Sequence, residues 1–370
     1  MSSAYPEFRA SRCTRYRFRY SECRRCADAC PHDAVALDDQ GAAIDPARCQ
    51  NCALCVTACP TDALASDAFK PVDMLRQAIR QACFAIACAP SGATGDAVVP
   101  CLGAVDAGSL AYLAKRRIPV ELRGAAHCGQ CAHGARGAAQ LASQLEACAL
   151  LQQAAATPDA AADWIAPRLD QAEAATPARG QAFAAGRRQW FRRLVGRGAA
   201  ELAQAADGPA SAPPPIPNQA IRPGPYALPE RRELLQIVCT RKDGQPFQAP
   251  LHEALPMFAL TLRPGCTTCE ACFRVCPTGA LEIEESPDDY QLKFDADRCV
   301  GCAVCLEACQ PRVLDVEAVF DARPEQPPRV LLAMSKQRCA RCDRHFVSPV
   351  PEESCPICRD DEDAFTAIFG

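Results

Sequence analysis

Four cysteine runs with nearly the same internal spacing constrain this chain more than any other feature of its sequence. Three have the full pattern C-x2-C-x2-C-x3-C and begin at Cys49, Cys266 and Cys299, whereas the fourth, at 23–30, lacks its first cysteine. In such a run the first three thiolates can hold one iron–sulfur cubane, while the fourth points away and completes a second cluster. The runs therefore predict clusters in two pairs, one pair near each end of the chain.

The composition of the chain supports metal ligation rather than disulfide bonding. Its 370 residues include 27 cysteines, most of them in C-x2-C pairs spread along the chain, which is typical of metal sites in a reducing compartment. The net charge of −4 argues against nucleic acid as the main partner. Because there is no apolar run at 1–12 and no long apolar stretch elsewhere, we expect a cytoplasmic protein without a transmembrane segment, with peripheral membrane contact left open.

The N-terminal pair of runs resembles bacterial two-[4Fe-4S] ferredoxins, through Cys23, Cys26, Cys30-Pro31 and the complete run that ends at Cys59-Pro60. A β-hairpin is predicted between the two runs, at 33–45. We assign residues 1–68 to this first ferredoxin-like unit, called unit 1. The resemblance implies one cluster on Cys30, Cys49, Cys52 and Cys55, and another on Cys23, Cys26, Cys59 and one more ligand.

The missing ligand is the point at which unit 1 departs from the ferredoxin pattern. The first cysteine of the run would fall at position 20, which is Tyr20, and the nearest candidate upstream is Cys13. We predict that a longer loop delivers Cys13 to the cluster, because ligation requires a position in space rather than a fixed spacing. The alternative is a three-ligand cluster that is incomplete or of the [3Fe-4S] type.

The C-terminal pair of runs resembles the same ferredoxins and has all eight cysteines. We assign residues 231–320 to this unit, called unit 2, with a hairpin predicted at 280–294. Its departure from the pattern is Gln310, which displaces the usual proline to position 311 and affects no ligand. The resemblance implies one cluster on Cys266, Cys269, Cys272 and Cys309, and another on Cys276, Cys299, Cys302 and Cys305.

Residues 69–153 are predicted to form an α/β domain between the two units. Strands expected at 84–87, 97–99 and 118–122 alternate with helices at 72–82 and 107–117 and with a long Ala-rich helix that ends at about 153, which is typical of a parallel sheet. Cys88, Cys101, Cys128 and Cys131 follow the three strands, where ligands of such sheets gather. We therefore predict a metal or iron–sulfur site there. The alternative is a set of buried thiols.

Two histidines flank the C-x2-C pair of the middle domain. Either His127 or His133 could replace a cysteine as a ligand, but we expect each to be partly exposed and solvated. The domain is similar to the small iron–sulfur subunit that links hydrogenases to heterodisulfide reductases, on Cys88, Cys101 and the segment 128–131 alone.

The C-terminal tail, at 335–362, is predicted to be a zinc ribbon. Two C-x2-C knuckles twelve residues apart supply four thiolates for one tetrahedral ion: Cys339, Cys342, Cys355 and Cys358. A rubredoxin-like iron site would use the same ligands. The remaining cysteines, Cys83, Cys148 and Cys239, are interpreted as small buried apolar residues.

The segment 154–230 is rich in alanine, proline and charge and is predicted to be a helical and Pro-rich linker. Within it a short basic amphipathic helix is expected at 187–195, either packed on a neighbouring domain or docked on a membrane or partner. Arginines are also dense before and within the first run. They form either a docking patch for an acidic partner or a solvated face: Arg9, Arg12, Arg15, Arg17, Arg19, Arg24 and Arg25.

The sequence thus predicts an α+β chain with two ferredoxin-like 2x[4Fe-4S] units, an α/β domain with a parallel sheet between them, and a small zinc ribbon. Because no nucleotide-binding or hydrolytic motif is visible, we expect a polyferredoxin-like electron-transfer subunit. It would carry four [4Fe-4S] clusters, zinc and a further cluster or metal. Its partners would be a larger oxidoreductase (a molybdenum-dependent dehydrogenase, a hydrogenase or a reductase) and a second donor or acceptor. The alternatives are disulfide or sulfur chemistry at the middle-domain cysteines, or a structural adaptor.

Overall fold

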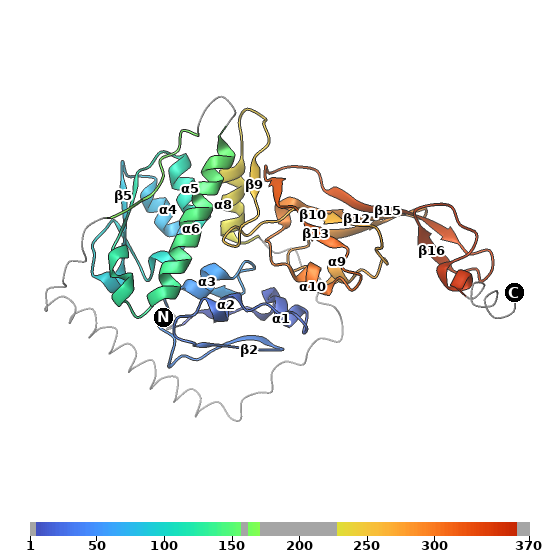
Figure 1. The fold of residues 1–370 in the computed structure, drawn as a ribbon, viewed down its shortest axis with the longest axis horizontal. Coiled ribbons are helices and arrows are strands. Elements are labelled where there is room, and N and C mark those ends of the chain that lie inside the picture. The colour runs from blue at the N-terminus through green and yellow to red at the C-terminus, as the bar shows by residue number, and fades with distance from the viewer. Residues whose placement is uncertain (1–4, 157–161, 171–227, 361–370) are drawn as a thin grey trace.

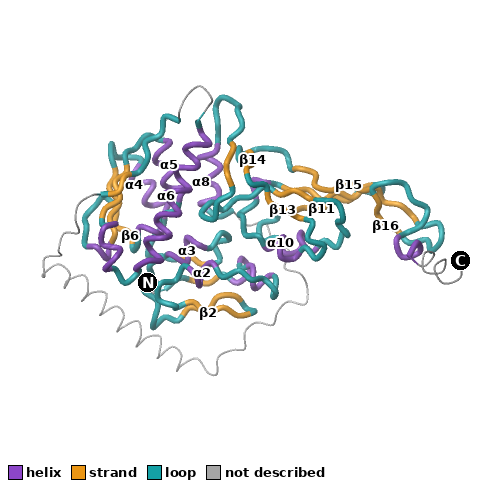
Figure 2. The backbone as a smooth tube through the Cα atoms, in the orientation of Figure 1, coloured by secondary structure: helices purple, strands orange, loops and turns teal. Residues whose placement is uncertain are grey.

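The computed structural model describes residues 5–156, 162–170 and 228–360. The basic helix predicted at 187–195 lies outside the described residues. Figures 1 and 2 show the middle domain at one end, unit 1 and unit 2 beside it, and the C-terminal ribbon projecting at the other end.

Unit 1 is built from short elements around its cysteine loops. Strand β1 pairs with β4, β2 pairs with β3 as the predicted hairpin, and three short helices lie between them. Gly41 opens β3 with φ of +114°, and a Cβ there would lie 2.4 Å from Cζ of Phe8, so this turn requires glycine. The elements are β1 (Glu7–Phe8), α1 (Thr14–Arg17), α2 (Arg25–Asp28), β2 (Val35–Asp38), β3 (Gly41–Ile44), α3 (Leu54–Ala58) and β4 (Leu64–Ala65).

The middle domain contains the predicted parallel sheet, in the order β6-β5-β7-β8. The central strand β5 is buried along its whole length, as expected for a strand covered on both faces. Strand β8 comes from the segment predicted as linker, so the sheet has one strand more than expected. The elements are α4 (Pro71–Ala78), β5 (Phe84–Cys88), β6 (Ala97–Val99), α5 (Ala107–Lys115), β7 (Val120–Arg123), α6 (Gly134–Ala155) and β8 (Arg168–Leu169).

Helix α8 (Glu230–Cys239) joins the middle domain to unit 2. Its apolar face, with Leu235 and Val238, belongs to the same core as the middle-domain sheet. That core continues into β9 (Gln248–Pro250) and β14 (Val319–Asp321), which pair with each other.

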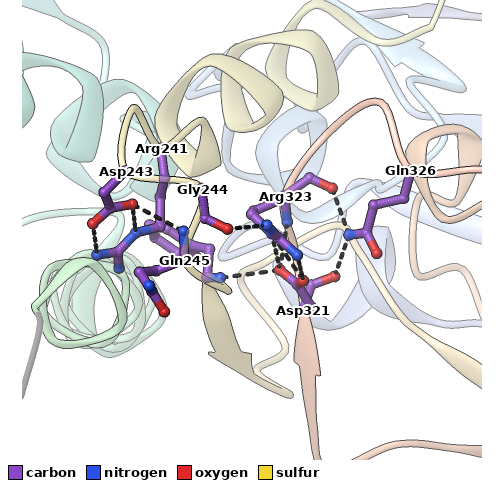
Figure 3. A network of polar contacts seen from close by, with 8 residues as sticks. Arg241, Asp243, Gly244, Gln245, Asp321, Arg323 and Gln326 are labelled. Atoms are coloured by element: carbon purple, nitrogen blue, oxygen red, sulfur yellow. Dashed lines mark hydrogen bonds and ion pairs between the residues drawn. The ribbon is translucent and has the colours of Figure 1, made fainter.

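A polar network fixes the turn that follows α8 (Figure 3). Arg241 donates to Asp243 at 2.6 Å, while Arg323 pairs with Asp321 and donates to the carbonyl of Gly244. The turn after α8 is thereby held to the end of β14.

Unit 2 and the ribbon share one antiparallel sheet, in the order β11-β12-β15-β16. Strands β11 and β12 form the predicted hairpin, and the ten-residue β15 runs from unit 2 into the ribbon. The elements are β10 (Leu260–Leu262), α9 (Ala271–Val275), β11 (Leu281–Glu285), β12 (Asp289–Phe294), α10 (Val304–Ala308), β13 (Leu314–Val316), β15 (Arg329–Arg338) and β16 (His345–Ser348).

The mixed helix-and-strand class and the parallel sheet predicted from the sequence are confirmed. Among the residues that the structure describes, no helix is long and apolar enough to cross a bilayer.

Candidate functional site

The three complete cysteine runs share one backbone geometry. In each run, the residue before and the residue after the second cysteine have positive φ values, between 51° and 66°. For a non-glycine residue this conformation costs on the order of 1–3 kcal/mol and persists only where the surroundings impose it, as at functional sites. The residues concerned are Asn51, Ala53, Thr268, Glu270, Gly301 and Ala303.

The first group of cysteines in unit 2 surrounds Cys272. Burial raises the pKa of Cys272 to about 12, and repulsion from Cys266, Cys309 and Cys269 adds to the rise. These four thiols therefore lie close together. Cys269 is exposed, so this group reaches the surface. Repelling, partly buried thiolates need a cation among them, which a metal cluster supplies.

The second group in unit 2 lies deeper. Burial raises the pKa of Cys299 to about 11, with a contribution from Cys276, and burial raises the pKa of Cys302 still further. The pKa of Cys305 is raised by burial and by repulsion from Cys302, Cys299, Cys276 and Cys272. Since Cys272 belongs to the first group, the two groups adjoin.

Unit 1 repeats this arrangement, and the structure brings Cys13 to it. Burial raises the pKa of Cys26 to about 12, and Cys59, Cys23 and Cys13 add to the rise. Tyr20, by contrast, is 71% exposed and packs edge-on against Phe18. The position at which the pattern expects a ligand therefore points to solvent, while Cys13 lies beside the other three cysteines of the group.

The second group of unit 1 lines one pocket, whose lining includes Cys30, Cys49, Cys52 and Cys55. Burial raises the pKa of Cys52 to about 11, and nearby Cys30 and Cys49 contribute. Cys55 interacts electrostatically with these cysteines and with Cys26 of the first group. The two groups of unit 1 therefore also adjoin.

The four middle-domain cysteines meet at the carboxyl edge of the parallel sheet. Cys88 ends β5, Cys101 follows β6, and Cys128 and Cys131 follow β7. All four line one pocket. Burial raises the pKa of Cys101 to about 12, and the further contributions come from Cys88, Cys128 and, across the boundary with unit 1, Cys52. The middle-domain group thus lies next to a cysteine group of unit 1.

Two histidines also meet at this boundary. The ring of His133 lies edge-on to that of His32 in unit 1, with ring centroids 5.4 Å apart. Their donor nitrogens and the sulfur of Cys52 lie within 4.8 Å of one another. His133 is buried, so the expectation that it is solvated is wrong, whereas His127 is partly exposed as predicted. His32 gave no signal in the sequence because no ligand spacing includes it.

The ribbon cysteines Cys339, Cys342, Cys355 and Cys358 form the most compact group. Their four sulfurs all lie within 4.8 Å of one another, and Sγ of Cys342 is 3.7 Å from Sγ of Cys355. A tetrahedral ion with bonds of about 2.3 Å to sulfur would separate its ligands by ~3.8 Å. Backbone N–H groups, first that of Cys355, lower the pKa of Cys339 to about 6, which favours the thiolate needed for ligation. The group fits one metal ion.

Within 5–156, 162–170 and 228–360, no other four cysteines meet the same 4.8 Å limit. The groups of units 1 and 2 and of the middle domain are therefore more widely spaced than the ribbon group. Such spacing suits a cofactor larger than one ion.

The remaining three cysteines do not share one environment. Cys148 and Cys239 are buried, as predicted, but Cys83 is exposed. The prediction for Cys83 is wrong because α4 ends at Ala78, short of the predicted residue 82, and leaves Cys83 in the exposed loop before β5.

Comparison with known protein families identifies two segments of the chain. The model of the 4Fe-4S dicluster domain matches residues 21–63 and 265–313. The chain therefore carries two dicluster domains, which confirms the two ferredoxin-like units predicted from the cysteine runs.

Parts of the chain are similar to subunits named in curated proteins. The chain is 29% identical over 116 residues to a probable iron-sulfur protein of the Frd operon of Proteus vulgaris, covering 30% of this chain and 71% of that protein. It is 34% identical over 61 residues to pyruvate synthase subunit PorD of Methanocaldococcus jannaschii, covering 16% of this chain and 62% of that protein. It is 27% identical over 86 residues to NADH-quinone oxidoreductase subunit I 2 of Geobacter metallireducens, covering 21% of this chain and 66% of that protein. The chain thus spans slightly less than two thirds of the second and third of these relatives.

Proposed function

We propose that this chain is a multi-cluster iron–sulfur electron-transfer protein that relays electrons between redox partners, as a subunit or partner of a larger oxidoreductase. The observation that carries the proposal is the contiguity of its cysteine groups. Cys276, Cys305 and Cys309, which come from both groups of unit 2, lie in one buried cluster, and Cys52 of unit 1 lies in another with Cys101 of the middle domain. Cys55 interacts electrostatically with Cys26, so the two groups of unit 1 also adjoin. Each group outside the ribbon therefore borders another. Iron–sulfur clusters supply one-electron chemistry, and neighbouring clusters pass electrons on.

The proposed ligand sets follow the four groups in the two units. Unit 1 (1–68) would hold one [4Fe-4S] cluster on Cys13, Cys23, Cys26 and Cys59 and one on Cys30, Cys49, Cys52 and Cys55. Unit 2 (231–320) would hold one on Cys266, Cys269, Cys272 and Cys309 and one on Cys276, Cys299, Cys302 and Cys305. The pKa rises caused by burial and mutual repulsion support these sets, because clusters would balance the thiolate charge.

Two further sites would complete the set of cofactors. We assign zinc to Cys339, Cys342, Cys355 and Cys358 because of the short distances between their sulfurs. We assign an iron–sulfur cluster to Cys88, Cys101, Cys128 and Cys131, because all four line one pocket and their sulfurs are more widely spaced than those of the ribbon. The names of the relatives favour an oxidoreductase complex as the partner.

Metal analysis of anaerobically prepared full-length protein tests the proposal. We expect roughly sixteen irons per chain from the four clusters of the two units, about one zinc and additional iron from the middle domain. Cys13→Ser should lower the iron content and change the electron paramagnetic resonance (EPR) signal of one cluster, whereas Tyr20→Phe, at an exposed position, should leave both unchanged. Wild-type protein with only a few irons would refute the relay, and a Cys13→Ser variant identical to wild type would refute the ligand role of Cys13.

A second function is favoured by the exposure of part of the middle-domain group. Cys128 and Cys131 are partly exposed, whereas Cys88 and Cys101 are buried. Substrate could therefore reach them for disulfide or sulfur chemistry fed by the two units. Under this alternative, Cys128→Ser abolishes turnover by the assembled complex. Intact turnover with altered cluster content would leave only the relay.

A further inference from the structure

The two ferredoxin-like units meet through an arginine that follows Cys13. Arg17 ends α1, the helix that begins directly after Cys13. Its guanidinium donates to three consecutive carbonyls of unit 2, those of Arg274 (3.4 Å), Val275 (3.1 Å) and Cys276 (3.1 Å). These carbonyls lie at the end of α9, where carbonyls have no partner within the helix. The side chain of Arg17 thus connects the helix that follows one proposed ligand, Cys13, to the backbone of another, Cys276.

A second arginine makes a parallel connection. Arg25 precedes Cys26 in the chain and donates to the carbonyl of Gly301 at 3.3 Å, directly before Cys302. Burial strongly raises the pKa of Cys302, and the charge of Arg25 opposes that rise. Gly301 has φ of +60°, and a Cβ there would lie 3.0 Å from the backbone nitrogen of Met257, so this acceptor position favours glycine.

Apolar side chains close the rest of the contact. Val275, Val304 and Ala308 of unit 2 form a small buried cluster, and Phe18 of unit 1 packs against it. Cys302 packs against the same cluster. The contact between the units therefore has an apolar part and two guanidinium groups, with a cysteine group on either side of it. We call this contact, made by Arg17, Phe18 and Arg25 with unit 2, the unit seam.

We propose that the unit seam is the crossing through which electrons pass between the two units. The crossing would join the site of Cys13, Cys23, Cys26 and Cys59 to the site of Cys276, Cys299, Cys302 and Cys305. This inference rests on the proposed relay function and specifies its path. In the step one electron leaves the cluster on one side, which is oxidised, and enters the cluster on the other, which is reduced. No bond forms or breaks and no proton moves.

The charges at the seam suit this role. Thiolate-held clusters carry net negative charge, so two of them facing each other across a low-dielectric contact repel. Arg17 and Arg25 place positive charge between the two sites and stabilise the reduced form on both sides. The arginines therefore hold the units together and keep both facing sites reducible.

The test uses the full-length, cluster-loaded chain with the Arg17→Met/Arg25→Met double variant. The matched control is Arg19→Met/Arg24→Met, because those arginines form exposed ion pairs with Asp39 and Asp28 in the same unit. Protein is mixed with less than one equivalent of dithionite and freeze-quenched. EPR signals of the two units are assigned beforehand from variants that lack one cluster.

We expect the double variant to keep the full iron content but to redistribute electrons between the units about tenfold or more slowly than the control. The reduction potentials of the two facing sites should fall, while those of the outer sites stay unchanged. Arg17→Lys/Arg25→Lys, which restores the charges, should recover the potentials. A merely structural contact would not move two potentials selectively.

Unchanged redistribution and unchanged potentials at full iron content would refute the crossing. If the double variant does not retain its clusters, the single Arg25→Met variant serves instead, since it removes only the bond to Gly301. The rate of electron redistribution and the reduction potentials of the two facing sites then test the crossing in that variant. Low iron content in the wild-type protein would refute the relay itself, and that result is distinguishable from a failure of the crossing.

Discussion

Replacing Arg232 should loosen the joint between α8 and unit 2 without unfolding the chain. Its side chain is only 4% exposed, and its guanidinium donates to the carbonyls of Cys299 and Ala296, each at 2.8 Å. Asp297 lies 3.9 Å away. The change Arg232→Met keeps most of the side-chain length and removes both hydrogen bonds and the charge.

The expected cost follows from these two bonds. Hydrogen bonds from a charged donor contribute about 1.5–3 kcal/mol each, so their loss amounts to about 3–6 kcal/mol. Removing a buried charge returns part of that, since an apolar side chain of similar volume carries no desolvation cost. We expect a net loss of about 3 kcal/mol in the free energy of local opening, which corresponds to roughly 100-fold faster amide exchange.

Hydrogen exchange read by mass spectrometry, on peptides covering 230–239 and 296–301, measures this opening. The measurement suits a multidomain protein with cofactors, for which a single free energy of unfolding is not defined. The control is Glu233→Gln at an exposed position of the same helix, which should change protection by less than about 0.5 kcal/mol. Arg231→Met should instead loosen the contact with unit 1, where Arg231 pairs with Asp62 at 2.9 Å. Equal protection in Arg232→Met and wild type would refute the reasoning.

Three further outcomes are expected. Alkylation of the folded protein by iodoacetamide at pH 8 should label Cys83, which is exposed. It should spare Cys148 and Cys239, because burial raises the pKa of both thiols to about 12. Mass spectrometry after digestion measures the labelling of each cysteine. Treatment with a zinc chelator should expose the amides of 339–358 to exchange while iron content stays constant, since the four ribbon cysteines form a group separate from the other cysteine groups. Gly41→Ala should lower the thermal midpoint of cluster loss by several degrees, because its Cβ would collide with Phe8 at a φ of +114°; an unchanged midpoint would contradict the predicted strain.

The cysteine groups of the two units and the parallel sheet could be predicted because their sequence signals are local. A C-x2-C-x2-C-x3-C run encodes a ligand geometry within about ten residues, and the alternation of strands with helices encodes a sheet edge at which Cys88, Cys101 and Cys128 meet. The convergence of Cys13 with Cys23, Cys26 and Cys59 was also predicted, although its spacing is irregular. Here the sequence offered a single nearby thiol, which limited the choice.

The contacts between the units could not be predicted, because the hydrogen-bond acceptors are backbone carbonyls and leave no signal in the amino-acid sequence. Arg17 is 258 residues from Val275, and it binds a backbone carbonyl, a group that nearly every residue presents in the same form. The contact of His133 with His32, which is supplied by unit 1, could not be predicted either, because no ligand spacing includes His32. Strand β8 is two residues long, too short for an alternating pattern to be recognised.

The arginines of unit 1 show how folding divides a set that composition treats as uniform. The sequence allows one role for all seven, either a docking patch or a solvated face. Arg19 and Arg24 form exposed ion pairs, as a solvated face requires. Arg15 donates to the carbonyls of Ser21 and Cys23 within its own unit. Arg17 and Arg25 do dock, but on unit 2 of the same chain. Arg17 and Arg25 already bind unit 2, so they are poor candidates for contacts with another protein. A mutational screen for partner docking on unit 1 should therefore be limited to the arginines that lie outside the unit seam.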